Sequence, residues 1–340
     1  MGARGRGSIL ILGEDSPGAL MHSYAAAFRS LGFEVATYCL SAAFRGGIVP
    51  LAARIIGRVA PSPLIRRFNR RVRREVAGRR YSLALVLKGE RLMVQTIREL
   101  CDATGAKWVN FYPDDPFSDV RSNRLVFGAE VLRAYDHCFT FGRDLVAAYQ
   151  ARGVERVDWL PFARDPEQHA PAAAVAAPDF DVVFAGNLDA ERTRWLEPLA
   201  GRVRLAVAGE WTRQALPSRS PLRAATFLPA AYGPALASLL ARGAISLNVL
   251  RSQNRLNHNM RSFESLACGA FTLSQRSAEL EELFREDEEV AFVDAPAELP
   301  AVVERWLARP EDRARIARAG FERVAHDTYA RRARTILECV

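Results

Sequence analysis

Residues 257–273 read NHNMRSFESLACGAFTL, in which a polar segment runs into a short helical pattern and then into an apolar run. We predict that this helix starts near Met260 and stops at Gly269, because glycine suits the left-handed residue that closes a helix. The run Ala270–Leu273 after it is typical of a buried strand. The first amides of such a helix form an anion site, and Glu264, one turn along, would reach a ligand held there.

Alternating strand and helix patterns fill the rest of the chain in two runs. The first run has predicted strands at Ser8–Leu12, Phe33–Cys39, Tyr81–Leu87, Trp108–Tyr112, Tyr135–Phe141 and Val157–Pro161. The second has them at Phe180–Phe184, Val203–Ala208, Phe227–Pro229, Ile245–Leu250, Ala270–Leu273 and Val290–Val293. Strands that alternate with helices build parallel sheets. The predicted fold class is therefore α/β, with two Rossmann-like, doubly wound domains facing a central cleft lined by strand ends.

A Pro- and Ala-rich segment, PAAAVAAP at 171–178, separates the two runs and indicates a linker. We predict an N-terminal domain over 1–165, a linker over 166–178 and a C-terminal domain over 179–320. The last segment, 321–340, contains the last predicted helix, Phe321–Leu337. We expect this helix to pack back on the N-terminal domain.

The cysteine and histidine patterns exclude a structural zinc site and a disulfide framework. Five widely spaced cysteines include no Cys-x-x-Cys, and five histidines include no His-x-x-x-His. We therefore expect a cytoplasmic protein without a metal. No apolar run approaches the roughly 18 residues that span a bilayer, and Gly13, Glu14 and Asp15 interrupt the first apolar run, which argues against a signal peptide.

Positive charge is concentrated between Phe44 and Arg80. Eleven arginines stand there against one acid, Glu75, which gives this segment a net charge of +10 in a chain of net charge +8. Apolar residues are interleaved with arginines over Ile48–Val59, a pattern typical of an amphipathic helix on an anionic membrane surface. A solvated helical face that is merely rich in arginine is the alternative. The partner predicted for Arg45–Arg80 is an anionic surface, which would place the protein peripherally on the inner membrane face.

Three residues of the N-terminal half are candidates for acid–base chemistry. Asp114 and Asp115 follow a predicted strand, at the edge of the sheet where ligands bind in α/β proteins. The alternative is that Asp114 caps a turn and Asp115 begins the next segment. His22 stands in the first predicted helix, where capping is its alternative role.

From Asp179 onward the sequence resembles the CgeB-like (spore-maturation-protein-like) glycosyltransferases, a GT-B group related to the group-1 transferases. The resemblance rests on the order FAGN, RLAVAGEW, ISLNVL, NMRSFESLACGAFTLSQ and IARAGFERVAHDTYARRA. The N-terminal half adds FYPDDPF and DHCFTFGRDLVAAY. The resemblance implies transfer of a sugar from a nucleotide-diphosphate donor bound by the C-terminal domain to an acceptor held by the N-terminal domain. A glycan, a lipid-linked molecule, a protein or a small molecule would be the acceptor.

This resemblance gives the residues of the C-terminal half their expected roles in holding the donor. Glu264 matches the acid that binds the ribose hydroxyls in related transferases. The helix start, with the adjoining polar residues, would meet the diphosphate with amides and charge. The donor-binding candidates are Gly186, Asn187, Arg192, Tyr232, Asn257, Asn259, Arg261, Ser262 and Glu264. Structural alternatives are a helix-dipole role for Glu264, a surface position for Arg261, and pairing of Arg192 with Asp189 or Glu191.

The sequence departs from the related Glu-x7-Glu transferases at one position. Their earlier acid, which contacts the sugar, corresponds to Leu256 here. By resemblance we expect retention of the anomeric configuration, which requires no dedicated base. An inverting enzyme would need one, and Asp115, Asp114 and His22 are its candidates.

Two other classes of function remain open from the sequence. A non-catalytic nucleotide-sugar-binding protein of the same fold is one, because of Leu256. A nucleic-acid-binding protein acting through Arg45–Arg80 is the other, although the segment carries few aromatic side chains for base stacking.

Overall fold

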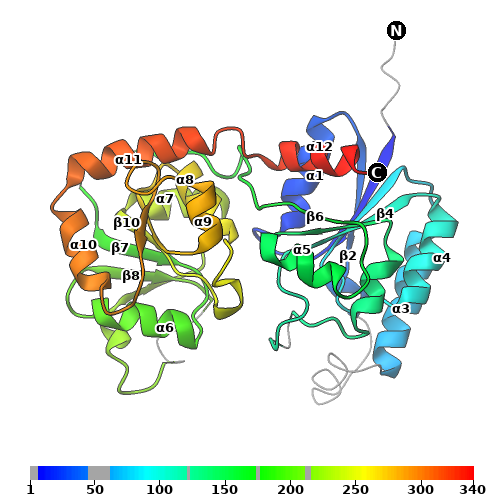
Figure 1. Ribbon diagram of the computed structural model, residues 1–340, viewed down its shortest axis with the longest axis horizontal. Helices are drawn as coiled ribbons and strands as arrows, with labels where there is room; N and C mark the ends of the chain where they lie inside the picture. The colour runs from blue at the N-terminus through cyan, green and yellow to red at the C-terminus, as the bar shows by residue number, and fades with distance from the viewer. Residues whose placement is uncertain (1–6, 45–61, 121–122, 174–176, 211–215) are drawn as a thin grey trace, which may run out of the picture. The chain divides into compact units, whose positions relative to one another are not determined.

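The computed structural model describes residues 7–44, 62–120, 123–173, 177–210 and 216–340 (Figure 1). The chain folds into two units. The N-terminal unit combines Met1–Pro161 with Tyr329–Val340, and the C-terminal unit is Phe162–Thr328. The chain therefore passes from one unit to the other twice.

The N-terminal unit is built on a six-stranded parallel sheet with strand order β2-β1-β3-β4-β5-β6. Its strands are β1 (Ser8–Gly13), β2 (Glu34–Cys39), β3 (Leu83–Leu87), β4 (Lys107–Tyr112), β5 (His137–Thr140) and β6 (Val157–Trp159). The central strands β1, β3 and β4 are almost wholly buried, as expected for a parallel sheet covered on both faces. The chain order of the strands reverses between β1 and β3, so the carboxyl ends of these two strands mark this unit's switch point.

The described part of this unit also contains helices of eight or more residues. They are α1 (Leu20–Ser30), α3 (Pro63–Val76), α4 (Val94–Thr104), α5 (Arg143–Gln150) and α12 (Tyr329–Glu338). Figure 1 shows α12 lying beside α1, although more than 300 residues separate their starts. The rings of Tyr24 and Tyr329 meet edge to face there, with centroids 5.2 Å apart.

The C-terminal unit has its own six-stranded parallel sheet, with strand order β12-β11-β10-β7-β8-β9. Its strands are β7 (Phe180–Ala185), β8 (Leu205–Ala208), β9 (Thr226–Leu228), β10 (Gly243–Asn248), β11 (Thr272–Gln275) and β12 (Ala291–Val293). Taken in chain order this is the Rossmann arrangement 3-2-1-4-5-6. The switch point lies between β7 and β10, which are hydrogen-bonded neighbours.

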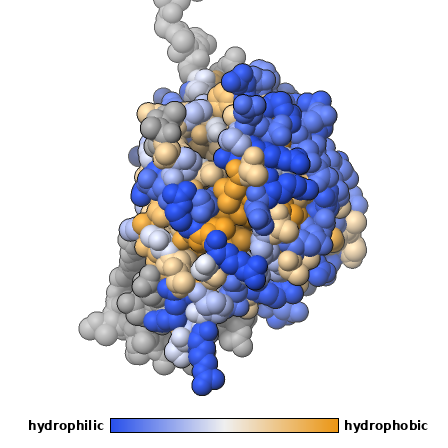
Figure 2. Space-filling view, turned by 90° about the vertical axis from the view of Figure 1, so that its left-hand side faces the viewer, coloured by the Kyte–Doolittle hydropathy of each residue, from blue (hydrophilic) through white to orange (hydrophobic). Residues whose placement is uncertain are grey.

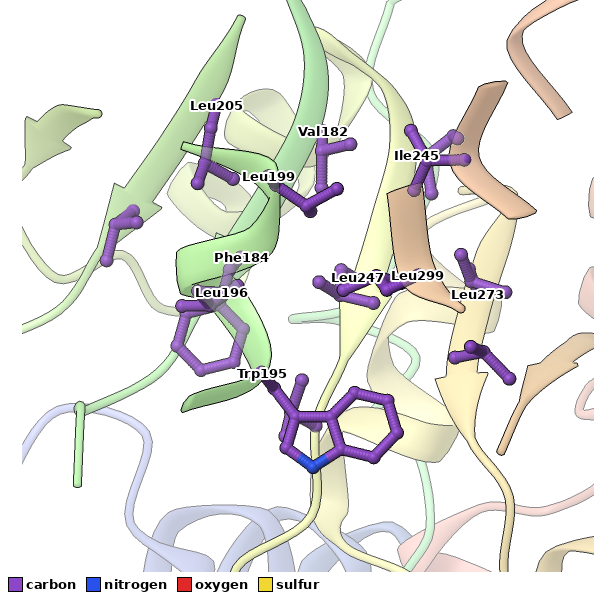
Figure 3. Packing of buried hydrophobic residues seen from close by; sticks show 14 of the residues in the cluster. Val182, Phe184, Trp195, Leu196, Leu199, Leu205, Ile245, Leu247, Leu273 and Leu299 are labelled. Atoms are coloured by element: carbon purple, nitrogen blue, oxygen red, sulfur yellow. The ribbon is translucent and has the colours of Figure 1, made fainter. Parts of the chain in front are cut away.

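Helices cover both faces of this second sheet. They are α6 (Ala190–Leu196), α7 (Gly233–Ala241), α8 (Met260–Ala267), α9 (Ala278–Leu283), α10 (Leu299–Leu307) and α11 (Pro310–Arg323). On one face, Trp195 and Leu196 of α6 and Leu299 of α10 pack on Val182 and Leu247 of the sheet (Figure 3). Each fully buried side chain of this size contributes about 1.5–3 kcal/mol to folding. Helix α7 packs on the other face.

One face of the molecule exposes hydrophobic side chains. Figure 2 shows hydrophobic side chains gathered at the centre of one face, with hydrophilic residues surrounding them. Among the described residues, no helix combines the length and apolar character that crossing a membrane requires.

The two parallel α/β sheets confirm the predicted fold class, whereas the helices differ from the predictions in places. The single helix predicted over Phe321–Leu337 is wrong, because α11 ends at Arg323 and α12 starts at Tyr329. The backbone between them instead pairs with Arg164, whose amide donates to the carbonyl of Asp327. Helix α3 was not predicted. The helix predicted over Ile48–Val59 lies outside the described residues.

Candidate functional site

The start of helix α8 lies at the switch point of the C-terminal sheet and is held there by buried amides and hydroxyls. Asn259 caps the helix, because its side chain accepts the Ser262 amide, and Ser262 completes a capping box. The Asn259 amide donates to Asn248 Oδ1 at 2.9 Å, and Asn248 Nδ2 donates to Ser262 Oγ at 3.1 Å and to Ser274 Oγ at 3.2 Å. This network fixes the helix start against the ends of β10 and β11.

Asn248 was not among the predicted site residues, and a signal for it exists in the sequence. It is the only residue with a side-chain amide in the apolar run ISLNVL, and a buried amide requires hydrogen-bond partners. Asn257, which was predicted as donor-binding, is buried beside this network. Its carbonyl accepts the Ser277 hydroxyl at 2.6 Å, so it ties the segment before α8 to the start of α9.

Arg261 and Glu264 lie one turn apart on α8 and form an ion pair with 2.9 Å between Nη1 and Oε2. Arg261 Nε also donates to the carbonyl of Ala185, the last residue of β7, at 3.2 Å. Both side chains are largely buried. The arginine therefore bridges the helix start and the end of β7, and the carboxylate is oriented by it.

His169 contacts the same carboxylate and was missed by the sequence reasoning. Its Nδ1 accepts the Asp165 amide at 3.1 Å, which places the proton of the neutral ring on Nε2. Nε2 lies 3.6 Å from Glu264 Oε1. Burial lowers the pKa of His169, with Glu264 opposing that effect. The polar segment RDPEQH before the alanine-rich run is the only signal for it in the sequence.

Arg192 of α6 spans the switch point with its side chain. Nε donates to the carbonyl of Val249 at 3.1 Å and Nη1 to that of Asn187 at 2.9 Å, so it joins the segments after β10 and β7. Burial lowers its pKa to about 10, with the charge of Arg251 adding to the effect. The pairing with Asp189 exists only through the Arg192 amide, which Asp189 accepts as the helix cap. Among the described residues the guanidinium forms no ion pair, and it contributes positive charge that Asp189 offsets only in part.

The turn Gly186–Asn187 is joined to the end of β8. Asn187 Oδ1 accepts the Glu210 amide at 2.9 Å. A Cβ on Gly209 would lie 2.6 Å from the carbonyl oxygen of Gly186, so only glycine allows the two backbones to approach this closely. These turns form one wall of the site.

Tyr232 and Leu256 supply exposed apolar surface around these groups. Tyr232 is 40% exposed and Leu256 56%. Burial raises the pKa of Tyr232, and the charges of Glu210 and Arg261 act on its hydroxyl in opposite directions. The structure thus brings the predicted residues that follow β7 and those of α6 and α8 to one edge of the sheet. Tyr232 lies close enough to Glu210 and Arg261 to be affected by their charges.

The N-terminal candidates follow strand ends of the first sheet. Asp114 Oδ2 accepts Lys88 Nζ at 2.8 Å, and Lys88 follows β3 with a positive φ of 68°. Asp115 Oδ1 accepts the Phe117 amide at 2.8 Å, and burial raises its pKa. Of the pair, Asp115 is therefore the residue that caps a turn, whereas the alternative assigned that role to Asp114.

His22 contacts Asp15, a residue of the segment between β1 and α1. Its Nε2 lies 3.1 Å from Asp15 Oδ1, and both side chains are more than half exposed. Such a carboxylate orients the imidazole of a general base. The side chain makes no capping hydrogen bond at the start of α1.

The cleft predicted between the domains stays a prediction.

Comparison with known proteins relates both the sequence and the fold to glycosyltransferases. Residues 192–338 match a family model described as glycosyl transferase-like. A comparison with curated protein sequences gives no match.

Solved structures share the fold over nearly the whole chain. Sucrose-phosphate synthase from Thermosynechococcus elongatus has a TM-score of 0.70 and 14% identity, covering 98% of each chain. Anabaena Alr3699/HepE in complex with UDP-glucose has a TM-score of 0.64 and 12% identity, covering 98% of this chain and 100% of the other. An alpha-glucosyltransferase in complex with UDP-glucose and DNA containing an abasic site has a TM-score of 0.67 and 10% identity, covering 98% of each. The chain has the GT-B fold of these glycosyltransferases.

Proposed function

We propose that this protein is a glycosyltransferase that moves a sugar from a nucleotide-diphosphate donor to an acceptor. One observation carries the proposal. The capped start of α8, the partly buried Arg192 and Arg261, and Glu264 converge at the switch point of the C-terminal sheet, where α/β proteins bind nucleotides. The match of residues 192–338 to the glycosyl transferase-like model supports it, as do relatives of similar fold bound to UDP-glucose. The motif order after Asp179 supports placing the chain near the CgeB-like group.

The arginines retain hydrogen-bond donors for the diphosphate. A guanidinium has five N–H groups. Arg192 uses Nε and Nη1 on carbonyls. Arg261 uses Nε on the carbonyl of Ala185, whereas its Nη1 is ion-paired with Glu264 and makes no hydrogen bond. Among the described residues, Nη2 of neither arginine makes a hydrogen bond. These groups and the first amides of α8 would stabilise the charge that develops on the leaving diphosphate, so the proposed reaction uses no metal cofactor.

Glu264 and His169 would hold the nucleoside. A carboxylate accepts from both hydroxyls of a ribose, and Arg261 and His169 orient its two oxygens. Leu256 stands at the position where the related Glu-x7-Glu enzymes contact the sugar, and it offers apolar surface rather than a second acid. Tyr232 belongs to a loop that could hold the base of the nucleotide. The donor is therefore held chiefly by its nucleotide.

The binding step is tested by calorimetry with UDP, GDP, ADP and dTDP. We expect at least one diphosphate to bind. Glu264→Gln should weaken that binding roughly tenfold, because a hydrogen bond to a charged group contributes about 1.5–3 kcal/mol. Glu281→Gln, on α9, is the control and should leave binding unchanged. The absence of any nucleotide binding, or equal affinities for both variants, would refute the donor site.

The stereochemical course is proposed to be retention. Proton NMR of the first product from an α-linked donor should then show an α-linkage. Under retention, His22→Ala should lower kcat by less than tenfold, because no dedicated base is needed. An inverted product together with a loss of 10²–10⁴-fold in His22→Ala would instead identify the His22–Asp15 pair as the base.

The acceptor is proposed to be a glycan or a lipid-linked molecule, met at the inner face of an anionic membrane. The arginines of 45–80 support this location, because basic segments bind anionic leaflets. Nucleic acid is the less favoured anionic partner.

A non-catalytic donor-binding protein is the second candidate, and Leu256 favours it, since no acid stands at the sugar-contacting position. Incubation with the bound nucleotide sugar separates the two. Transfer to an acceptor or slow donor hydrolysis identifies the enzyme, whereas tight binding with an intact donor identifies the binding protein.

A further inference from the structure

Helix α3 carries a dense set of arginines on the face opposite its buried side. Ser62 caps the helix, and Ile65, Phe68, Val72 and Val76 pack inward. Between residues 62 and 80 the sequence has eight arginines and one acid, Glu75. The helix packs through its apolar stripe, and the exposed Arg66, Arg67 and Arg70 are not needed for that packing.

A cavity of about 220 Å³ lies between α3 and the start of α4. Its lining residues are Pro63, Arg66, Asn69, Arg70, Arg73, Met93, Gln95 and Thr96. Its shape is fixed by Asn69, a side chain only 1% exposed. Asn69 Nδ2 donates to the carbonyls of Ile65 and Arg91, and its Oδ1 accepts the Met93 amide, each at 2.9 Å. The start of α4 is thereby held against the arginine face of α3.

Two of the lining arginines lack a counter-charge. Among the described residues, Arg66 and Arg70 form no ion pair, whereas Arg73 pairs with Glu99. The one acid of α3, Glu75, is engaged by Arg71 and Arg74. Residues 45–61, which precede the helix, contain no Asp or Glu at all. Within the described part of the chain, the charges of Arg66 and Arg70 are therefore not neutralised by an ion pair.

We infer that the cavity between α3 and α4 is a binding site for a phosphate group. Two guanidiniums spaced one helical turn apart can each bind phosphate oxygens with a two-pronged fork. Gln95 and Thr96, in the first turn of α4, also line the cavity, and this helix has no side-chain cap on its first amides. The volume is below the 300–1,000 Å³ of typical small-molecule sites, so it fits a headgroup-sized anion. The group would come from a phospholipid or from a free phosphorylated molecule.

The experiment compares two double variants that lose the same charge. Arg66→Gln/Arg70→Gln removes the lining arginines, and Arg67→Gln/Arg79→Gln removes two exposed arginines that do not line the cavity. Binding of inorganic pyrophosphate is measured by calorimetry in the presence of saturating nucleoside diphosphate, which occupies the proposed donor site. Binding of vesicles of phosphatidylglycerol and phosphatidylcholine is measured by co-sedimentation. All four positions are exposed, and matching melting temperatures would establish that both variants fold.

We expect Arg66→Gln/Arg70→Gln to lose at least tenfold in affinity for at least one of the two probes. Arg67→Gln/Arg79→Gln should lose less than threefold for either probe. Loss in vesicle binding alone identifies a lipid headgroup as the source, and loss in pyrophosphate binding alone identifies a free phosphate compound. Equal losses in both variants, or no binding of either probe by the wild type, would overturn the inference. It does not rest on the proposed transferase activity, and nucleotide binding to the C-terminal unit should be the same in both variants.

Discussion

Glu264 faces Arg261 with one carboxylate oxygen and His169 with the other. The sequence places Arg261 and Glu264 together, because residues three apart share one side of a helix. His169 is 95 positions earlier, and its approach depends on how the segment after Pro161 folds over α8. Side chains brought together by such long-range contacts have no local signal, which is why this residue was missed.

His169 should make stability depend on pH. Burial lowers its pKa in the folded protein, so the unfolded chain, with a histidine pKa of about 6.5, binds the proton first as the pH falls. The free energy of unfolding therefore decreases below about pH 6.5, by at most about 1.4 kcal/mol per pH unit. In urea titrations at pH 7.5 and 5.5, wild type should lose more stability than His169→Gln.

Donor affinity separates a positioning role of His169 from a purely structural one. Glutamine keeps an N–H donor towards Glu264, so His169→Gln should bind nucleotide more tightly than His169→Leu. Equal nucleotide affinity in His169→Gln and His169→Leu would contradict the positioning role. If the free energy of unfolding of His169→Gln depended on pH as that of wild type does, His169 would not be the source of the pH dependence.

Helix α8 owes its position to its cap and to the polar ends of two strands. Asn259→Ala should lower the free energy of unfolding by about 1 kcal/mol, the usual cost of losing a cap. It should also weaken nucleotide binding, because the helix start would no longer be held by Asn248. Urea unfolding and calorimetry measure the two effects.

Ser62→Ala is the matched control for Asn259→Ala, because Ser62 caps helix α3 in the N-terminal unit. It should cost a similar amount of stability and leave nucleotide binding unchanged. Weakened nucleotide binding in Ser62→Ala, or unaltered binding in Asn259→Ala, would show that the α8 cap has no special part in holding the donor.

Most elements could be predicted from the sequence, and the failures have physical causes. Helix α8 and its stop at Gly269 follow from local signals, and Gly269 has the expected positive φ of 74°. Helix α3 was missed because its arginines obscure the four inward apolar residues. The break before α12 was missed because it depends on pairing of Asp327 with Arg164, a distant residue. The carbonyl contacts of Arg192 are likewise long-range, so sequence reasoning could weigh only its helical neighbours.

At the scale of the whole molecule, α12 completes the N-terminal unit. Its buried residues include Tyr329, Ala333 and Ile336. Ile336→Ala should lower the free energy of unfolding of that unit by about 2–5 kcal/mol, whereas Arg334→Ala, an exposed neighbour, should change it by less than about 0.5 kcal/mol.

Calorimetry with and without nucleotide assigns this effect to one unit. A bound nucleotide stabilises the unit that holds it, and we propose that this is the C-terminal one. Ile336→Ala should lower the transition that nucleotide does not shift. A decrease confined to the nucleotide-dependent transition would contradict the assignment of α12 to the N-terminal unit.

The double passage of the chain sets an order for folding during synthesis. The C-terminal unit is one continuous segment, Phe162–Thr328, and can close its core as soon as it leaves the ribosome. The N-terminal unit is made first, yet its core lacks Tyr329 and Ile336 until the whole of the other unit has been translated. The N-terminal unit is therefore synthesised first and completes its folding last. Until α12 has been synthesised, the side of α1 that packs against it stays exposed and accessible to chaperones.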